Sequence, residues 1–288
     1  MSADATAATP VDAAPPSAPG RAGRDLPVAI VVGLGLGALV LGTLYTVKAA
    51  FLGVILAAIL VGLWELCRAL QVKNVYAPFI PLAVGTVALL VLAYTDGREA
   101  MTVAALLTAL AVVVWRLAEG AHGMLPDIAA GLMALVYVPF LAGFASLMLA
   151  PHDGHRRITA FIATVVASDV GGYAFGATLG RHLMAPRISP KKSWEGLVGS
   201  TLACAICGAV IFAALLHVMW WKGAVFGLAT VCTATLGDLG ESMVKRDLGI
   251  KDMGRVLPGH GGLMDRLDSL LPTAPVAWLL LTAFVPVH

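Results

Sequence analysis

The chain has 288 residues, of which 59% are apolar and only 12% are charged. A soluble domain carries about 45–50% apolar and about 25% charged residues, so this composition excludes an ordinary soluble protein. The net charge of +2 at pH 7 is too small to indicate a nucleic-acid partner, and none is expected.

Residues 1–25 are rich in Ala and Pro, so we predict a disordered cytoplasmic tail ahead of a membrane domain at 26–288. The tail lacks the basic region and short apolar core of a signal peptide. The rest of the chain contains nine apolar blocks, each near the roughly 20 residues that a helix needs to cross a ~30 Å hydrocarbon layer. We therefore predict an all-α, polytopic transmembrane helical bundle of about nine spans, in which the second and ninth are the least clear. The blocks are 26–47, 49–66, 78–95, 100–117, 126–150, 157–178, 196–217, 219–236 and 269–287.

The basic residues predict the orientation of these spans. If the N-terminus is cytoplasmic and the spans alternate, all but five of the 19 Lys and Arg residues fall on the cytoplasmic side. The five exceptions are Lys48, Arg98, Arg156, Arg157 and Lys222. The positive-inside rule then predicts a cytoplasmic N-terminus and an outer C-terminus, with the chain in the cell (inner) membrane.

Two of the predicted cytoplasmic segments, 179–195 and 237–268, are polar and hold most of the cytoplasmic cations. The second is long and punctuated by Gly, and both of its ends run directly into apolar blocks. Long irregular loops in compact proteins are often functional, so we expect an active site that faces the cytoplasm here.

The carboxylates of the second segment stand at helical spacings. If the eighth block continues as a helix, Asp238, Ser242 and Lys245 share one face, because residues three and four apart are neighbours. Asp265 and Asp268 are three apart at the start of the ninth block. Capping of that helix is a purely structural alternative for these two, since a helix N-terminus favours negative charge.

The same segment combines a Gly-rich turn at 258–262 with five cations. Mg²⁺ is typically bound by one or two carboxylates together with substrate phosphates, so the pattern favours a magnesium–phosphate site. The alternative is that the cations only contact lipid headgroups, but that would not require the carboxylates. The cations are Lys245, Arg246, Lys251, Arg255 and Arg266.

Two further acidic residues lie in apolar blocks. Asp169, beside Ser168, is near the middle of the sixth block, where a carboxylate costs on the order of 3 kcal/mol and usually faces a functional cavity. A hydrogen bond to another helix is the structural alternative. Glu65 is close to the end of its block, so we expect a structural residue whose carboxylate reaches water.

The stretch Ser242–Asp268 resembles the signature of phosphatidate cytidylyltransferases, also called CDP-diacylglycerol synthases. Two other patches are similar to family patterns, namely Ser168-Asp169 with Tyr173 and Gly176, and residues 189–196. Gly172 departs from the pattern because most members carry alanine there, and the N-terminal half resembles the family only in its apolar spans. The agreeing signature positions are Ser242, Lys245, Arg246, Lys251, Asp252, Gly254, Leu257, Pro258, His260, Gly261, Gly262, Asp265, Arg266 and Asp268.

The resemblance implies an enzyme of phospholipid biosynthesis that converts CTP and phosphatidate into CDP-diacylglycerol and pyrophosphate with Mg²⁺. It also implies contact with membrane lipids and a homodimer. By resemblance, Asp238, Asp265 and Asp268 would bind the metal, and Ser242, Lys245 and Arg246 would complete the catalytic set. Substrate contacts would come from Ser168, Asp169, Lys191, Lys192, Lys251, His260, Gly261, Gly262 and Arg266.

Two other classes of function remain as alternatives. A membrane transporter would also explain Asp169, but it would not explain a long polar segment on one side, and no inverted repeat of broken helices is evident. A different lipid phosphotransferase, such as a CDP-alcohol transferase, would carry a longer Asp-rich pattern.

Overall fold

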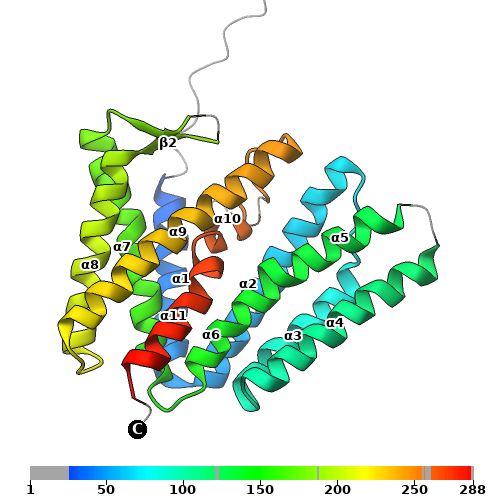
Figure 1. The fold of residues 1–288 in the computed structure, drawn as a ribbon, viewed down its shortest axis with the longest axis horizontal. Coiled ribbons are helices and arrows are strands. Elements are labelled where there is room, and N and C mark those ends of the chain that lie inside the picture. The colour runs from blue at the N-terminus through cyan, green and yellow to red at the C-terminus, as the bar shows by residue number, and fades with distance from the viewer. Residues whose placement is uncertain (1–25, 121–122, 187, 255, 257–260, 287–288) are drawn as a thin grey trace, which may run out of the picture.

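The computed structural model describes residues 26–120, 123–186, 188–254, 256 and 261–286, so the predicted tail at 1–25 lies outside the described residues. Helices form most of the described chain, and one short antiparallel hairpin, β1 (Leu183–Ala185) with β2 (Ser189–Ser193), interrupts them. Figure 1 shows the helices as a bundle. They are α1 (Leu26–Thr46), α2 (Lys48–Leu70), η1 (Gln71–Lys73), α3 (Phe79–Thr95), α4 (Arg98–Glu119), α5 (Met124–Leu135), η2 (Val136–Phe140), α6 (Leu141–Leu149), α7 (Gly154–Leu179), α8 (Trp194–Ala214), α9 (Trp220–Leu248), α10 (Met264–Leu267) and α11 (Leu270–Phe284).

Seven helical segments of the described chain are long and apolar enough to cross a membrane. Two shorter apolar helices, Val31–Thr46 and Phe79–Thr95, accompany them. The helices coincide with the predicted apolar blocks, so the polytopic helical class is confirmed, whereas the count of nine spans and the orientation stay predictions. The seven segments are Lys48–Lys73, Arg98–Glu119, Met124–Leu149, Gly154–Leu179, Trp194–Ala214, Trp220–Leu248 and Met264–Phe284.

One face of α8 shows why these helices suit a bilayer. Val198, Leu202, Ile206 and Val210 follow each other at four-residue spacing, and each exposes half or more of its surface. Soluble monomers rarely expose such a continuous apolar strip. The strip is therefore suited to contact lipid chains.

Glycines bring α8 and α9 into close contact. A Cβ atom added to Gly208 would lie 2.2 Å from the carbonyl oxygen of Gly223, and one added to Gly227 would lie 2.1 Å from that of Cys204. Small residues at these positions let the two backbones approach, which is how helices commonly associate in membranes. The helix α8 begins after Ser193, whose Oγ accepts a hydrogen bond from the Gly196 amide at 3.1 Å.

The polar elements gather at one end of the bundle. The hairpin, the C-terminal part of α9 and α10 lie toward the same end in Figure 1, and the C-terminus lies at the opposite end. The two segments that the sequence singled out, 179–195 and 237–268, are thus neighbours in space.

Candidate active site

A polar cavity of about 340 Å³ lies between α7, α8, α9 and β2. Four of the predicted site residues line it: Ser168, Asp169, Lys192 and Asp238. Ser269, which follows α10, also contributes to the wall. The cavity therefore draws on both predicted segments and on the middle of α7.

Asp169 is exposed toward this polar cavity. The described part of the chain provides no hydrogen bond to its carboxylate. The helix–helix contact beside it is made instead by Ser200, whose Oγ donates to the carbonyl oxygen of Ser168 at 2.6 Å. A Cβ atom on Gly172 would lie 2.6 Å from that same Oγ, so the departure from the family pattern at this position leaves room for Ser200.

Lys192 ties the hairpin to α9. Its Nζ lies 2.6 Å from Oδ2 of Asp238, and Ser242 Oγ donates to Oδ1 of the same carboxylate at 3.4 Å, as expected for one helical face. A second link runs from Arg246 Nε to the carbonyl oxygen of Ile188 at 3.3 Å. The Lys192 and Asp238 side chains are 22% and 35% exposed, so solvent and ligands reach this ion pair.

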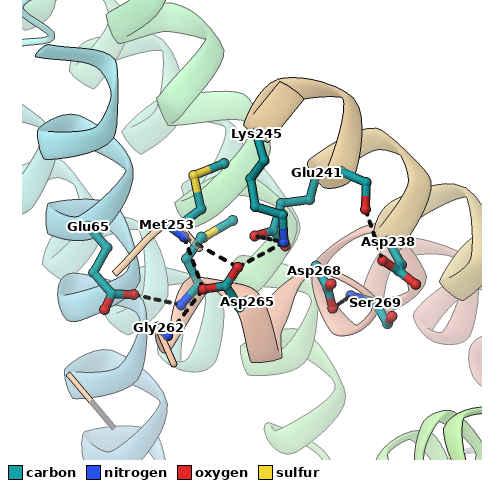
Figure 2. Close-up of polar contacts among 11 residues, drawn as sticks. Glu65, Asp238, Glu241, Lys245, Met253, Gly262, Asp265, Asp268 and Ser269 are labelled. Atoms are coloured by element: carbon teal, nitrogen blue, oxygen red, sulfur yellow. Dashed lines mark hydrogen bonds and ion pairs between the residues drawn. The ribbon is translucent and has the colours of Figure 1, made fainter. Parts of the chain in front are cut away.

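A second group of charges is centred on Lys245. In Figure 2 this group lies on one side of Asp268, and Asp238 lies on the other side. Lys245 Nζ is 2.8 Å from Oδ1 of Asp265. Oδ2 of Asp265 accepts hydrogen bonds from the backbone amides of Met253 at 3.0 Å and Gly262 at 3.1 Å. The Asp265 carboxylate thus holds the backbone at Met253 and Gly262, which follow α9, against α10.

Two glycines make this arrangement possible. A Cβ atom on Gly262 would lie 2.6 Å from Oδ2 of Asp265, so any larger residue would disturb the two amide contacts. A Cβ atom on Gly237 would lie 2.3 Å from the carbonyl oxygen of Asp268. The missing side chain at Gly237 lets α9 approach the α10–α11 turn, where Asp268 Oδ1 accepts from the Ser269 amide at 2.6 Å.

Glu241 is a site residue that the sequence analysis missed. Its side chain is fully buried, and within the described residues neither carboxylate oxygen has a hydrogen-bond partner. Lys245 Nζ lies 3.3 Å from Oε1, which is an ion-pair distance without hydrogen-bond geometry. The signal was available, because Glu241 stands three residues after Asp238 and four before Lys245 on the same helical face.

Glu65 corrects a second expectation. Its place in the sequence predicts that the carboxylate reaches water, and this prediction is wrong, since the residue is 1% exposed. Oε2 accepts a hydrogen bond from the backbone amide of Met264 at 2.8 Å (Figure 2). The loop after α9 covers the carboxylate, and so α2 takes part in the site region.

The remaining predicted residues lie at the surface or outside the described range. Lys251, Arg246 and Arg266 are exposed, and Gly261 has a positive φ of 83°, a conformation that favours glycine. His260 and the side chain of Lys191 lie outside the described residues.

The charges of the site suit a hard divalent cation. Four carboxylates, those of Asp238, Glu241, Asp265 and Asp268, face two ammonium groups, those of Lys192 and Lys245. The carboxylate oxygens of Glu241, which accept no hydrogen bond from the described residues, are ligands of the kind that Mg²⁺ prefers. Within the described residues no three His, Cys, Asp or Glu side chains form a preassembled metal site, so the fit rests on charge and donor type.

Comparison with known proteins agrees with this geometry. Residues 27–284 match the model of the cytidylyltransferase family. A phosphatidate cytidylyltransferase of Mycobacterium bovis is 42% identical over 276 residues, which cover 91% of this chain and 90% of the relative. That of Mycobacterium leprae is 42% identical over 279 residues, covering 91% and 89%. That of Brucella suis is 39% identical over 146 residues, covering 49% and 54%. The resemblance found in the sequence is thereby confirmed, and the chain belongs to the cytidylyltransferase family.

Proposed function

We propose that this chain is a phosphatidate cytidylyltransferase, which converts CTP and phosphatidate into CDP-diacylglycerol and pyrophosphate for phospholipid biosynthesis. The observation that carries the proposal is the match to enzymes of that name over nine-tenths of both chains. A polar cavity at one end of an apolar helical bundle is the setting that such substrates need. The relatives described above carry the name phosphatidate cytidylyltransferase, which favours this function over a transporter or a different phosphotransferase.

The reaction poses mainly an electrostatic problem. A phosphate oxygen of phosphatidate attacks the α-phosphorus of CTP, the bond from that phosphorus to the bridging oxygen breaks, and pyrophosphate leaves. A phosphate monoester is largely ionised near neutral pH, so its oxygen needs little help from a general base. The task of the protein is to hold two anions together and to neutralise their charge.

The side chains of the site divide this task between them. Lys192 and Lys245 lie close to the carboxylates and would neutralise the triphosphate or the lipid phosphate, and Arg246 and Lys251 extend the positive surface outward. Asp169 and Ser168 line the polar cavity, where they would position the lipid headgroup. Ser242 orients the Asp238 carboxylate by its hydrogen bond.

Mg²⁺ is part of the proposal. Asp238, Asp265 and Asp268 would hold it by resemblance to the family, and Glu241 adds a fourth carboxylate whose oxygens accept no hydrogen bond from the described residues. The ion would supply positive charge to the phosphate oxygens as pyrophosphate leaves. The Asp238 side chain is 35% exposed, whereas that of Asp265 is 10% exposed and accepts hydrogen bonds from two backbone amides, so Asp238 is the more available ligand of the two.

The membrane setting completes the proposal. We expect nine spans in the cell (inner) membrane, with the N-terminus and the polar cavity on the cytoplasmic side, because most of the cations lie there. Phosphatidate would enter from the bilayer and CTP from the cytosol. A homodimer remains an expectation from the family resemblance.

The test is direct. Purified protein is incubated with CTP labelled at the α-phosphate, phosphatidate and Mg²⁺, and the label is followed into the lipid phase. We expect labelled CDP-diacylglycerol together with one pyrophosphate per product. Release of label without a lipid product, or incorporation without phosphatidate, would contradict the proposal.

A further inference from the structure

Glu65 joins the N-terminal half of the molecule to the loop at residues 249–263, which we call the signature loop. It lies on α2 and is separated by 199 positions from Met264, whose amide donates to Oε2 at 2.8 Å. The carboxylate is 1% exposed, and within the described residues Oε1 has no partner. A buried carboxylate is costly unless it is paired and hydrogen-bonded, so the hydrogen bond from Met264 matters to this region.

Two glycines of the signature loop, Gly254 and Gly262, lie against this carboxylate. A Cβ atom on Gly254 would lie 1.9 Å from Oε1, and a Cβ atom on Gly262 would lie 2.9 Å from Oε2. Gly254 is not in the positive-φ region, so its own backbone would accept a side chain. Among the described residues, the three atoms nearest to that Cβ all belong to the Glu65 side chain, which therefore favours glycine at this position.

One turn earlier on α2, Gly62 continues the same contact. A Cβ atom there would lie 3.1 Å from Cδ1 of Leu267, and the Met264 backbone is 3.9 Å away. Met264 itself is fully buried. The inner face of α2 therefore forms a platform for α10, which carries Asp265 and leads directly to Asp268.

We infer that Glu65 is a positioning residue for the active site. By holding the Met264 amide and filling the space beside Gly254, it fixes the described part of the signature loop and, through α10, the place of Asp265. This role rests on the proposed function. The positioning depends on the oxygen that accepts the hydrogen bond and not on the negative charge. Because Glu65 belongs to the N-terminal half, that half of the chain then influences how tightly the site binds CTP.

Hydrogen exchange tests the contact without any need for activity. Loss of one buried hydrogen bond is expected to speed exchange of the Met264 amide in Glu65→Ala by about tenfold or more. Glu65→Gln keeps an acceptor of the same shape and should exchange as the wild type does. Unchanged exchange in Glu65→Ala, or equal loss of protection in both variants, would overturn the inference even if the enzyme is active.

Kinetics then separate positioning from simple stability. Glu65→Ala should raise the KM for CTP by about tenfold, the equivalent of one buried hydrogen bond, while Glu65→Gln stays near wild type. Leu82→Ala is the matched control, because Leu82 is fully buried in α3, which packs mainly against α4, α2 and α6. If Glu65→Ala lowers only the melting temperature, as Leu82→Ala should, the inference fails. Absence of transfer by the wild type would instead refute the proposed function.

A double variant gives a reciprocal test. Gly254→Ala places a methyl group against the Glu65 carboxylate and should impair CTP binding. Removing that carboxylate makes room, so Glu65→Ala/Gly254→Ala should be no worse than Glu65→Ala alone. Additive losses would show that the two residues act independently and would overturn the inference.

Discussion

At the scale of single residues, the site is organised as two separate ion pairs on either side of Asp268. Lys192 pairs with Asp238 at the polar cavity, and Lys245 pairs with Asp265 beneath the signature loop. The first pair is partly exposed and is open to exchange with a ligand, whereas the second is largely enclosed. Asp238 is therefore suited to contact ligands, and Asp265 to hold the loop.

Asp238→Ala and Asp265→Ala are each expected to abolish cytidylyl transfer, for different reasons. The first variant removes a carboxylate from the cavity wall, and the second releases the signature loop. Loss of such a group costs about 10²–10³ in rate, and because both changes disable the same metal–phosphate site, the double variant should lose little more. The measurement is Mg²⁺-dependent turnover per folded molecule, with the exposed Asp247→Ala on the same helix as the control.

If these carboxylates only stabilise the fold, the outcome would be different. Each change would then cost about 1 kcal/mol of unfolding free energy and would leave turnover per folded molecule nearly intact. Near-normal turnover with an unaltered Mg²⁺ requirement would remove that residue from the site.

Asp169→Asn is expected to lower turnover while the protein still folds and inserts. Its carboxylate faces the polar cavity, and no described residue hydrogen-bonds to it, so an amide should cost little stability. The loss of charge should reduce turnover by roughly tenfold, or about 1.4 kcal/mol. Melting in detergent and turnover are measured on the same sample. Loss of folded protein instead would favour a structural hydrogen bond.

At the scale of helices and strands, the sequence predicts well where each helix lies along the chain and poorly which residues it contacts. Apolar blocks of about 20 residues predict helices such as α3 and α8 because length and hydropathy are local properties. The contact between Glu65 and Met264 spans 199 positions, and no local pattern encodes it. The hairpin β1–β2 was not predicted either, since its strands are only three and five residues long and carry no alternation of apolar and polar residues.

The contact between α8 and α9 gives a prediction at this scale. Gly208→Ala should lower unfolding free energy by about 1–3 kcal/mol, because the new methyl group would meet the Gly223 backbone, which cannot move aside easily. Gly53→Ala on α2 is the matched control, since a Cβ atom there meets nothing within 4 Å. Thermal melting in detergent compares the two. Equal melting temperatures would contradict the close packing of α8 on α9.

At the scale of the whole molecule, the arrangement of the charges predicts which end faces the cytoplasm. Lys251→Cys, at an exposed position of the signature loop, should react with a membrane-impermeant thiol reagent only after cells are opened. His152→Cys, at an exposed position ahead of α7, should react in intact cells. Both changes are made in a background without the four native cysteines. The reverse labelling pattern would invert the proposed topology.

The large separation in sequence between Glu65 and Met264 also affects how the protein folds during its synthesis. Ribosomes add about 5–20 residues per second, so Glu65 is synthesised about 10 to 40 s before Met264, the residue that it will hold. During this interval α2 has no partner for its acidic group. The site is therefore completed only when the last helices arrive, and a chain truncated before α10 would contain most of the bundle and yet be unable to assemble its catalytic end.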